Sequence, residues 1–200
     1  MSKGLLFGLL VAMGILFTVD SFAQPQQNRI EVDNSTGDAV SIDHRHTLHW
    51  EDSHLWLVDL QTMQRKLLAT RNSALAAGWS PSGRFFYVED RVASSEQHLS
   101  IYTDSGALFL AVDEAILHAD MQARELFHNS HAYFAAIDWL NREELQVRYF
   151  GHTDYYPSRC FDLKFRLSLW ENADDPLRSF SVHRTKLLIA PAGSSVCRQL

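Results

Sequence analysis

The alternation of apolar and polar residues at every second position is the feature that most constrains the fold of this chain. It is clearest at Phe161–Leu169, where phenylalanine and leucine at the odd positions alternate with polar residues at the even ones. Leu145–Phe150 repeats the pattern over a shorter stretch. Because successive side chains of a strand point to opposite faces, this period predicts antiparallel sheet with one buried and one polar face.

Other segments extend the β-rich interpretation. Leu55–Leu60 and Phe85–Val88 carry apolar residues on both faces, which predicts interior strands that are covered on two sides. Leu99–Thr103 and Leu108–Val112 flank an Asp-Ser-Gly turn at 104–106, which predicts a hairpin.

One segment departs from the strand period. Asp113–Phe127 has apolar residues at roughly helical spacing, and Asp113 stands where a helix cap is expected. We therefore predict an all-β, mainly antiparallel fold with one inserted helix.

A short motif suggests a family. Trp79-Ser80-Pro81-Ser82-Gly83-Arg84 lies between two predicted strands and resembles the W-S-P-D-G-R corner of TolB-like and WD-repeat β-propeller blades, with Ser82 where Asp is usual. The resemblance covers about one good blade at 55–90 and a poorer one at 99–149. The chain has material for about three such units, whereas propellers close with four or more. We expect blade-like hairpins in an open sheet stack or incomplete propeller, and the resemblance implies a scaffold for binding.

The N-terminal residues predict export. Lys3 precedes an apolar run from Gly4 to about Val19, and Ser21 and Ala23 occupy the small-residue positions of a cleavage site. This pattern favours a cleaved signal peptide at 1–23 over an uncleaved anchor, and it leaves 24–200 as a single β-rich domain. No second long apolar run follows, so we expect a periplasmic or secreted protein without membrane insertion after cleavage.

The two cysteines, Cys160 and Cys197, predict a disulfide in an oxidising compartment. Such a bond would attach the C-terminal segment to the strand that starts near Phe161. By the chain-entropy argument it would stabilise the fold by roughly 3–4 kcal/mol.

Charge and motifs narrow the class of function. The net charge of −6 argues against nucleic acid as a partner, because phosphate binding depends on clustered Lys and Arg. H-E-x-x-H, P-loop and G-x-G-x-x-G motifs are missing from the sequence. We therefore expect a non-catalytic module of the cell envelope that binds a protein partner, with an immunity or inhibitor protein as the most specific form. The tyrosine-rich loop Gly151–Arg159 suits such contacts, and the expected contact residues are Tyr149, Tyr155, Tyr156 and Arg159.

Metal binding is the alternative function. On a strand, His44 and His46 would share one face at a spacing that suits zinc or copper, with His49 as a third ligand if the strand bends. A weaker set has helical i, i+3 spacing and consists of Glu125, His128 and His131. No other cofactor is expected.

Overall fold

The computed structural model of the 200-residue chain describes residues 29–32, 37–70, 75–128, 130–154, 158–170, 180–195 and 197. Strands dominate the described residues, and the predicted all-β, mainly antiparallel fold is confirmed. The signal segment predicted at 1–23 lies outside the described residues. None of the helices in the described part has the length and apolar character of a membrane span.

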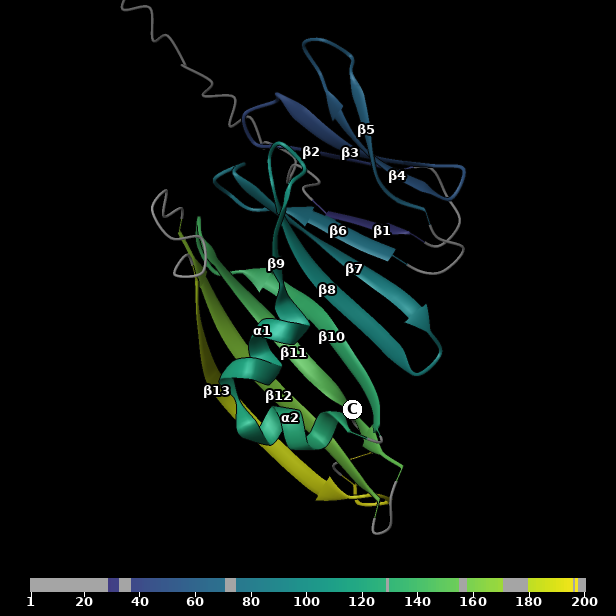
Figure 1. Cartoon of the computed structure of the whole chain (residues 1–200), viewed down its shortest axis with the longest axis vertical. Helices are drawn as coiled ribbons and strands as arrows, with labels where there is room; N and C mark the ends of the chain where they lie inside the picture. The colour runs from purple at the N-terminus through teal and green to yellow at the C-terminus, as the bar shows by residue number, and fades with distance from the viewer. Residues whose placement is uncertain are drawn as a thin grey trace, which may run out of the picture.

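A nine-stranded sheet forms most of the molecule (Figure 1). One half is antiparallel, in the order β1-β6-β7-β8 with β9 also paired to β8, and the other half is the antiparallel meander β10-β11-β12-β13. A short parallel pairing of β8 with β10 joins the halves, with Ala132 opposite Glu96. These strands are β1 (Arg29–Val32), β6 (Leu75–Trp79), β7 (Phe85–Ala93), β8 (Glu96–Thr103), β9 (Leu108–Ala111), β10 (Ser130–Trp139), β11 (Glu144–Thr153), β12 (Arg159–Leu169) and β13 (Phe180–Pro191).

A second, four-stranded sheet lies at one end of the molecule, at the top of Figure 1. It is a simple antiparallel meander in chain order, with β2 and β5 at its edges. Its strands are β2 (Gly37–Val40), β3 (His46–Glu51), β4 (His54–Asp59) and β5 (Arg65–Thr70).

Strand β7 belongs to both hydrophobic clusters of the protein. Phe85 and Tyr87 point into a large cluster with β8–β13 and the helices, whereas Phe86 and Val88 point into a cluster shared with the smaller sheet. The prediction that the strand at Phe85–Val88 is covered on both faces is therefore confirmed. Along each face the side chains alternate, as the period of two requires.

The matching prediction for Leu55–Leu60 is wrong for one face of β4. Leu55 and Leu57 pack against the larger sheet, but Trp56 on the opposite face is only partly buried and Leu60 is 37% exposed. The face of the smaller sheet that points away from the larger one carries both apolar and charged residues, and no other layer of the described chain covers it.

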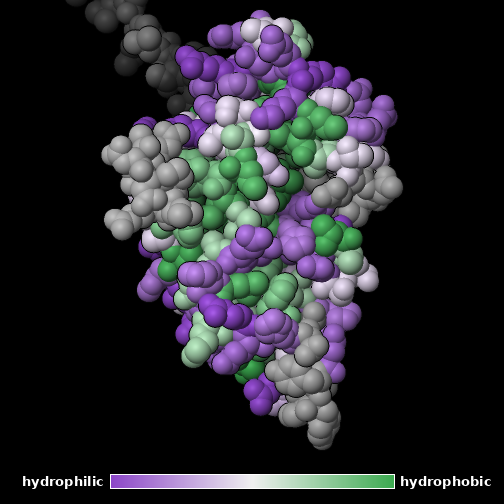
Figure 2. Space-filling view, viewed as in Figure 1, coloured by the Kyte–Doolittle hydropathy of each residue, from purple (hydrophilic) through white to green (hydrophobic). Residues whose placement is uncertain are grey.

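The inserted helix is present as two short helices, α1 (Val112–Ala119) and α2 (Met121–Phe127), which pack over one face of β10–β13 (Figure 1). Asp120 is extended between them, and its side chain accepts a hydrogen bond from the Ala123 N–H, so it caps α2. The predicted cap, Asp113, instead lies inside the first turn of α1 and binds His98. The face that carries the helices mixes hydrophobic and hydrophilic side chains (Figure 2).

The Trp79–Arg84 motif forms the corner between β6 and β7. The Ser80 N–H donates to the Phe85 carbonyl, and Gly83 supplies the positive φ of +73° that the turn needs. Trp79 is fully buried, and its indole N–H donates to the Ala39 carbonyl on β2. The motif therefore ties the smaller sheet to the larger one, and the two sheets do not close into a ring within the described residues.

Candidate metal centre

The face of β10–β13 that points away from the helices, called the outer face below, carries the most promising group of ligand atoms. Pairing in the sheet sets His131 on β10 opposite His152 on β11, and His152 opposite Cys160 on β12. Directly opposed residues of antiparallel strands have their Cβ atoms only about 4.5–5.5 Å apart and share a face. The two histidines therefore meet although 20 other residues separate them in the sequence.

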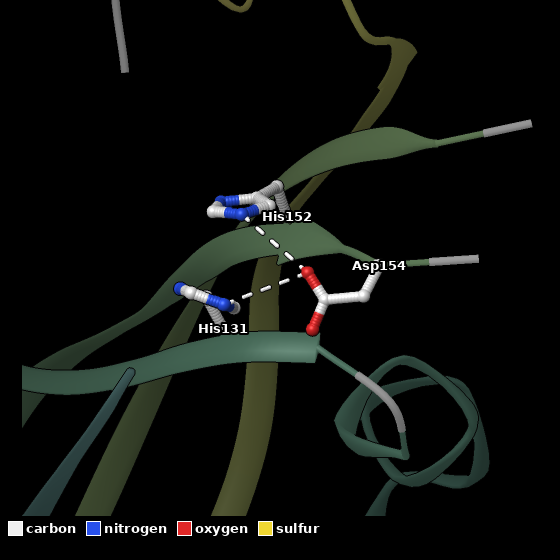
Figure 3. Close-up of side chains that lie close together, drawn as sticks. All are labelled: His131, His152 and Asp154. Carbon is white, nitrogen blue, oxygen red and sulfur yellow. Dashed lines mark ion pairs between the residues drawn. The ribbon is translucent and has the colours of Figure 1, made fainter. Parts of the chain in front are cut away.

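The side chains of His131, His152 and Asp154, called the His–His–Asp cluster below, converge at this point (Figure 3). The imidazole rings are stacked with centroids 4.5 Å apart. Asp154 follows β11 and sets one carboxylate oxygen, Oδ1, 3.6 Å from Nε2 of His131 and 3.7 Å from Nε2 of His152. One ligand atom from each of the three residues lies within 4.8 Å of the others.

The backbone around the cluster explains why the two histidines come so close. Gly151 precedes His152, and a Cβ atom at this position would collide with the backbone oxygen of His131. Only glycine allows β10 and β11 to approach as they do here. On the other side of the loop, the Arg159 N–H donates to Oγ1 of the buried Thr153, which holds the start of β12 against the end of β11.

The predicted disulfide forms beside the cluster. Cys160, opposite His152 in the sheet, is bonded to Cys197, with their Cα atoms 5.7 Å apart. The bond joins β12 to the segment that follows β13 across a sequence separation of 37. It anchors the strand next to the cluster, and it indicates an oxidising environment.

The distances from the Asp154 carboxylate to the two imidazoles are close to those between neighbouring ligands of a transition metal. Metal–ligand bonds of about 2.0–2.2 Å in a tetrahedral arrangement separate neighbouring ligand atoms by about 3.4 Å. The two oxygen–nitrogen distances given above exceed this value by only a few tenths of an ångström. Imidazole nitrogens are ligands that zinc and copper both accept, carboxylate oxygens also occur as zinc ligands, and three protein ligands leave a coordination position open.

The rest of the outer face is aromatic and charged. Next to the cluster Tyr133 packs on Phe150, and the Arg148 guanidinium lies 4.3 Å from the Phe150 ring centroid. Asp162, 3% exposed, accepts hydrogen bonds from Arg148 and Lys186. Burial by itself would raise the pKa of Asp162, but these two hydrogen bonds and the two positive charges outweigh it and lower the pKa.

The histidines predicted as ligands do not form a comparable group. His44 lies in the turn before β3 with a positive φ of +56°, so it does not share a strand face with His46. His46 stacks on Trp79, and His49 is held by Asp38 and Glu51 through its two ring nitrogens. The expected shared strand face of His44 and His46 is not formed, because β3 begins only at residue 46, two positions later than the pattern requires.

The second predicted set of ligands, Glu125, His128 and His131, is divided by the end of helix α2. α2 ends at Phe127, so Glu125 lies on the helix, His128 follows it and His131 is already on β10. Of this set only His131 belongs to the cluster.

The residues predicted to contact a partner lie in different environments. Tyr149 is fully buried and stacks on Phe134 with ring centroids 4.4 Å apart, so its side chain belongs to the core. Arg159 is exposed. Tyr155 and Tyr156 fall outside the described residues.

No known protein family, curated protein or solved structure matches this chain. The assignment of a site therefore depends on geometry alone.

Sequence reasoning missed His152 and Asp154 as ligands, although a signal for one of them was present. Leu145, Val147 and Tyr149 mark the core face of β11, and the same period places His152 on the opposite face. The pairing of His152 with His131, however, depends on the register between the two strands. A bulge between Ala136 and Asp138 shifts that register, and the pattern of single strands does not reveal it.

Proposed function

We propose that this protein binds zinc or copper reversibly at the His–His–Asp cluster, outside the cytoplasm. The observation that carries the proposal is the convergence of three ligand atoms from two paired strands and the following loop. The disulfide beside the cluster and the signal-like residues 1–23 support a periplasmic or secreted location.

Exposure and coordination favour exchange of the metal over a permanent structural role. About half of the His152 and Asp154 side-chain surface is accessible, and 38% of that of His131. Structural zinc sites are usually closed by four protein ligands, whereas this cluster offers three. Among the residues that the structure describes, neither imidazole has a hydrogen-bond partner at Nδ1, the second-shell contact that normally strengthens binding. These features support an uptake, storage or transfer role.

The metal-binding function is preferred to a protein-interaction module for a structural reason. Tyr149, one of the four expected contact residues, is buried, and Arg159 alone among the described members of that set is exposed. The His–His–Asp cluster, by contrast, brings two imidazoles and a carboxylate, all potential metal ligands, together at one point.

Calorimetric titration with zinc and with copper tests the proposal. The protein should begin at Gln24 and carry no histidine tag, because a tag would bind both metals. The wild type is expected to bind one equivalent. Since loss of a merely supporting residue often weakens metal binding by about 10–100-fold, His131→Ala, His152→Ala and Asp154→Ala should each weaken it by at least about tenfold.

His183→Ala is the matched control, since it removes an exposed histidine from β13 in the same sheet. Its affinity is expected to equal that of the wild type. Equal affinity in all variants, or no binding by the wild type, would refute the proposal.

A further inference from the structure

A second concave site lies on the smaller sheet, far from the His–His–Asp cluster in the fold. It is a pocket of about 390 Å³ on the face of β2–β5 that points away from the larger sheet. One row of paired residues crosses this face from β2 to β5, and it consists of Val40, Thr47, Val58 and Arg65. The volume is within the range of about 300–1,000 Å³ that is usual for small-molecule sites.

The centre of the pocket floor is apolar and protected from water. Val58 is only 7% exposed although no further layer of the described chain covers this face. Neighbouring side chains must therefore stand around it as walls, and the lining includes Val40 and Leu60. A recess of this kind on an otherwise open sheet face buries an apolar group without any rearrangement of the backbone.

The charged groups at the rim satisfy one another. Nδ1 of His49 lies 2.7 Å from the Asp38 carboxylate, and its Nε2 lies 3.5 Å from Glu51. Arg65 donates to Glu51 at 3.0 Å, and its guanidinium lies 4.5 Å from the centroid of the Trp56 ring. The hydrogen bond from Arg65 lowers the pKa of Glu51, so this carboxylate stays ionised and paired. Because Arg65, the one guanidinium among the residues that line the pocket, already faces a carboxylate, the site offers no unpaired cation to an anionic ligand.

The turn between β4 and β5 forms an apolar lip beside the pocket. Met63 has a positive φ of +58° and is 68% exposed, which is an unusual conformation for a residue other than glycine or asparagine. The Asp59 carboxylate fixes the turn by accepting hydrogen bonds from the Gln61 and Thr62 N–H groups. The strained backbone thus holds a flexible thioether at the rim, and methionine adapts well to apolar ligands of varied shape.

We infer that this pocket binds an uncharged apolar small molecule, such as a ring system or a short acyl chain. Its volume sets the size of the ligand, and its apolar floor and internally paired rim set the ligand's chemistry. The inference is independent of metal binding, because none of the residues that line the pocket belongs to the His–His–Asp cluster.

The test uses N-phenyl-1-naphthylamine, an uncharged apolar dye whose emission rises in an apolar environment. The wild type is expected to bind the dye saturably at one site. Leu60→Asp introduces a charge at the lip and Met63→Ala removes the thioether, and both positions are exposed, so neither change should prevent folding. Leu60→Asp should raise the dye Kd by about tenfold, in line with the loss of one leucine contact, and Met63→Ala should raise it by a smaller factor.

Leu108→Asp and Met121→Ala are the matched controls, at positions that are 60% and 72% exposed and lie outside the smaller sheet. They should bind the dye as the wild type does. Absence of saturable binding, or equal effects of the lip variants and their controls, would overturn the inference.

Discussion

At the scale of single residues, Asp162 shows how a buried carboxylate depends on its partners. It lies on β12 with 3% exposure, and Arg148 and Lys186 donate to its two oxygens at 2.8 and 2.9 Å. A buried ionised group without such partners would be strongly unfavourable. The three residues come from three adjacent strands, so the ion pairs also connect β11, β12 and β13.

We predict that Asp162→Asn makes stability less dependent on pH in acid. The folded-state pKa of Asp162 is lowered, so its stabilising effect is present above the unfolded pKa of about 3.9 and is lost as the pH falls through the folded value. At pH 7 the variant should be less stable by about 2 kcal/mol, because the charge-assisted hydrogen bonds are lost. The difference should shrink below about pH 4. Thermal unfolding of both proteins between pH 7 and pH 2.5 measures it.

Asp138→Asn provides the control, since Asp138 is an exposed carboxylate on β10 of the same sheet. It should leave the melting temperature nearly unchanged. A stability difference for Asp162→Asn that stays constant down to pH 2.5 would contradict the assigned role.

At the scale of elements, the sequence predicts individual strands far better than their partners. The alternation at Phe161–Leu169 identifies β12, and the doubly apolar Phe85–Val88 identifies a strand with two covered faces. Each of these signals is contained in the local sequence. The break between α1 and α2 also depends on a distant residue, because Arg184 on β13 lies 3.0 Å from the Asp120 carboxylate and helps to hold Asp120 out of the helix.

The candidate site shows the same limit. The face of β11 that carries His152 can be read from its period, whereas β10 shows no clear alternation of apolar and polar residues. The meeting of His131 with His152 also requires the register between the strands. For His44 the local pattern itself misleads, since it predicts a strand at residue 44 whereas β3 begins at residue 46. Local patterns indicate which face a residue occupies, whereas tertiary pairing decides what it meets.

We predict that Gly151→Ala separates β10 from β11 and disrupts the His–His–Asp cluster. The added Cβ would collide with the backbone oxygen of His131, and backbone atoms yield less readily than a flexible side chain. Overpacking typically costs about 1–3 kcal/mol, and a collision with backbone should fall at the upper end of this range. Urea denaturation should show this loss, and zinc or copper binding should weaken together with it.

Gly193→Ala separates the steric effect from backbone strain. Gly193 also has a positive φ, of +85°, but no atom lies within 4 Å of the position that its Cβ would occupy. This variant should lose only about 1 kcal/mol, the cost of a left-handed conformation for alanine, and its metal affinity should stay unchanged. Equal losses of stability and metal affinity in the two variants would show that the close approach of β10 to β11 is not the reason for a glycine at position 151.

At the scale of the whole molecule, two hydrophobic clusters share one strand. Phe85 and Tyr87 of β7 lie in one cluster, and Phe86 and Val88 lie in the other, so neither cluster keeps its packing if β7 leaves. The disulfide Cys160–Cys197 adjoins Phe161 of the larger cluster, at the end of β12 that lies away from the smaller sheet (Figure 1). Its removal therefore measures how far a local change in stability is transmitted.

We predict that replacing both cysteines by serine lowers the free energy of unfolding by roughly 3–4 kcal/mol, because the unfolded chain regains the conformational entropy that the loop had lost. If the shared strand makes the two clusters unfold as one unit, slow-exchanging amides of β3 in the smaller sheet and of β11 in the larger one should lose the same protection. Dithiothreitol should reproduce the effect in the wild type and leave the double variant unchanged. A loss of protection confined to β11 would mean that the clusters unfold separately, and that β7 is a contact between two units instead of the common core of one.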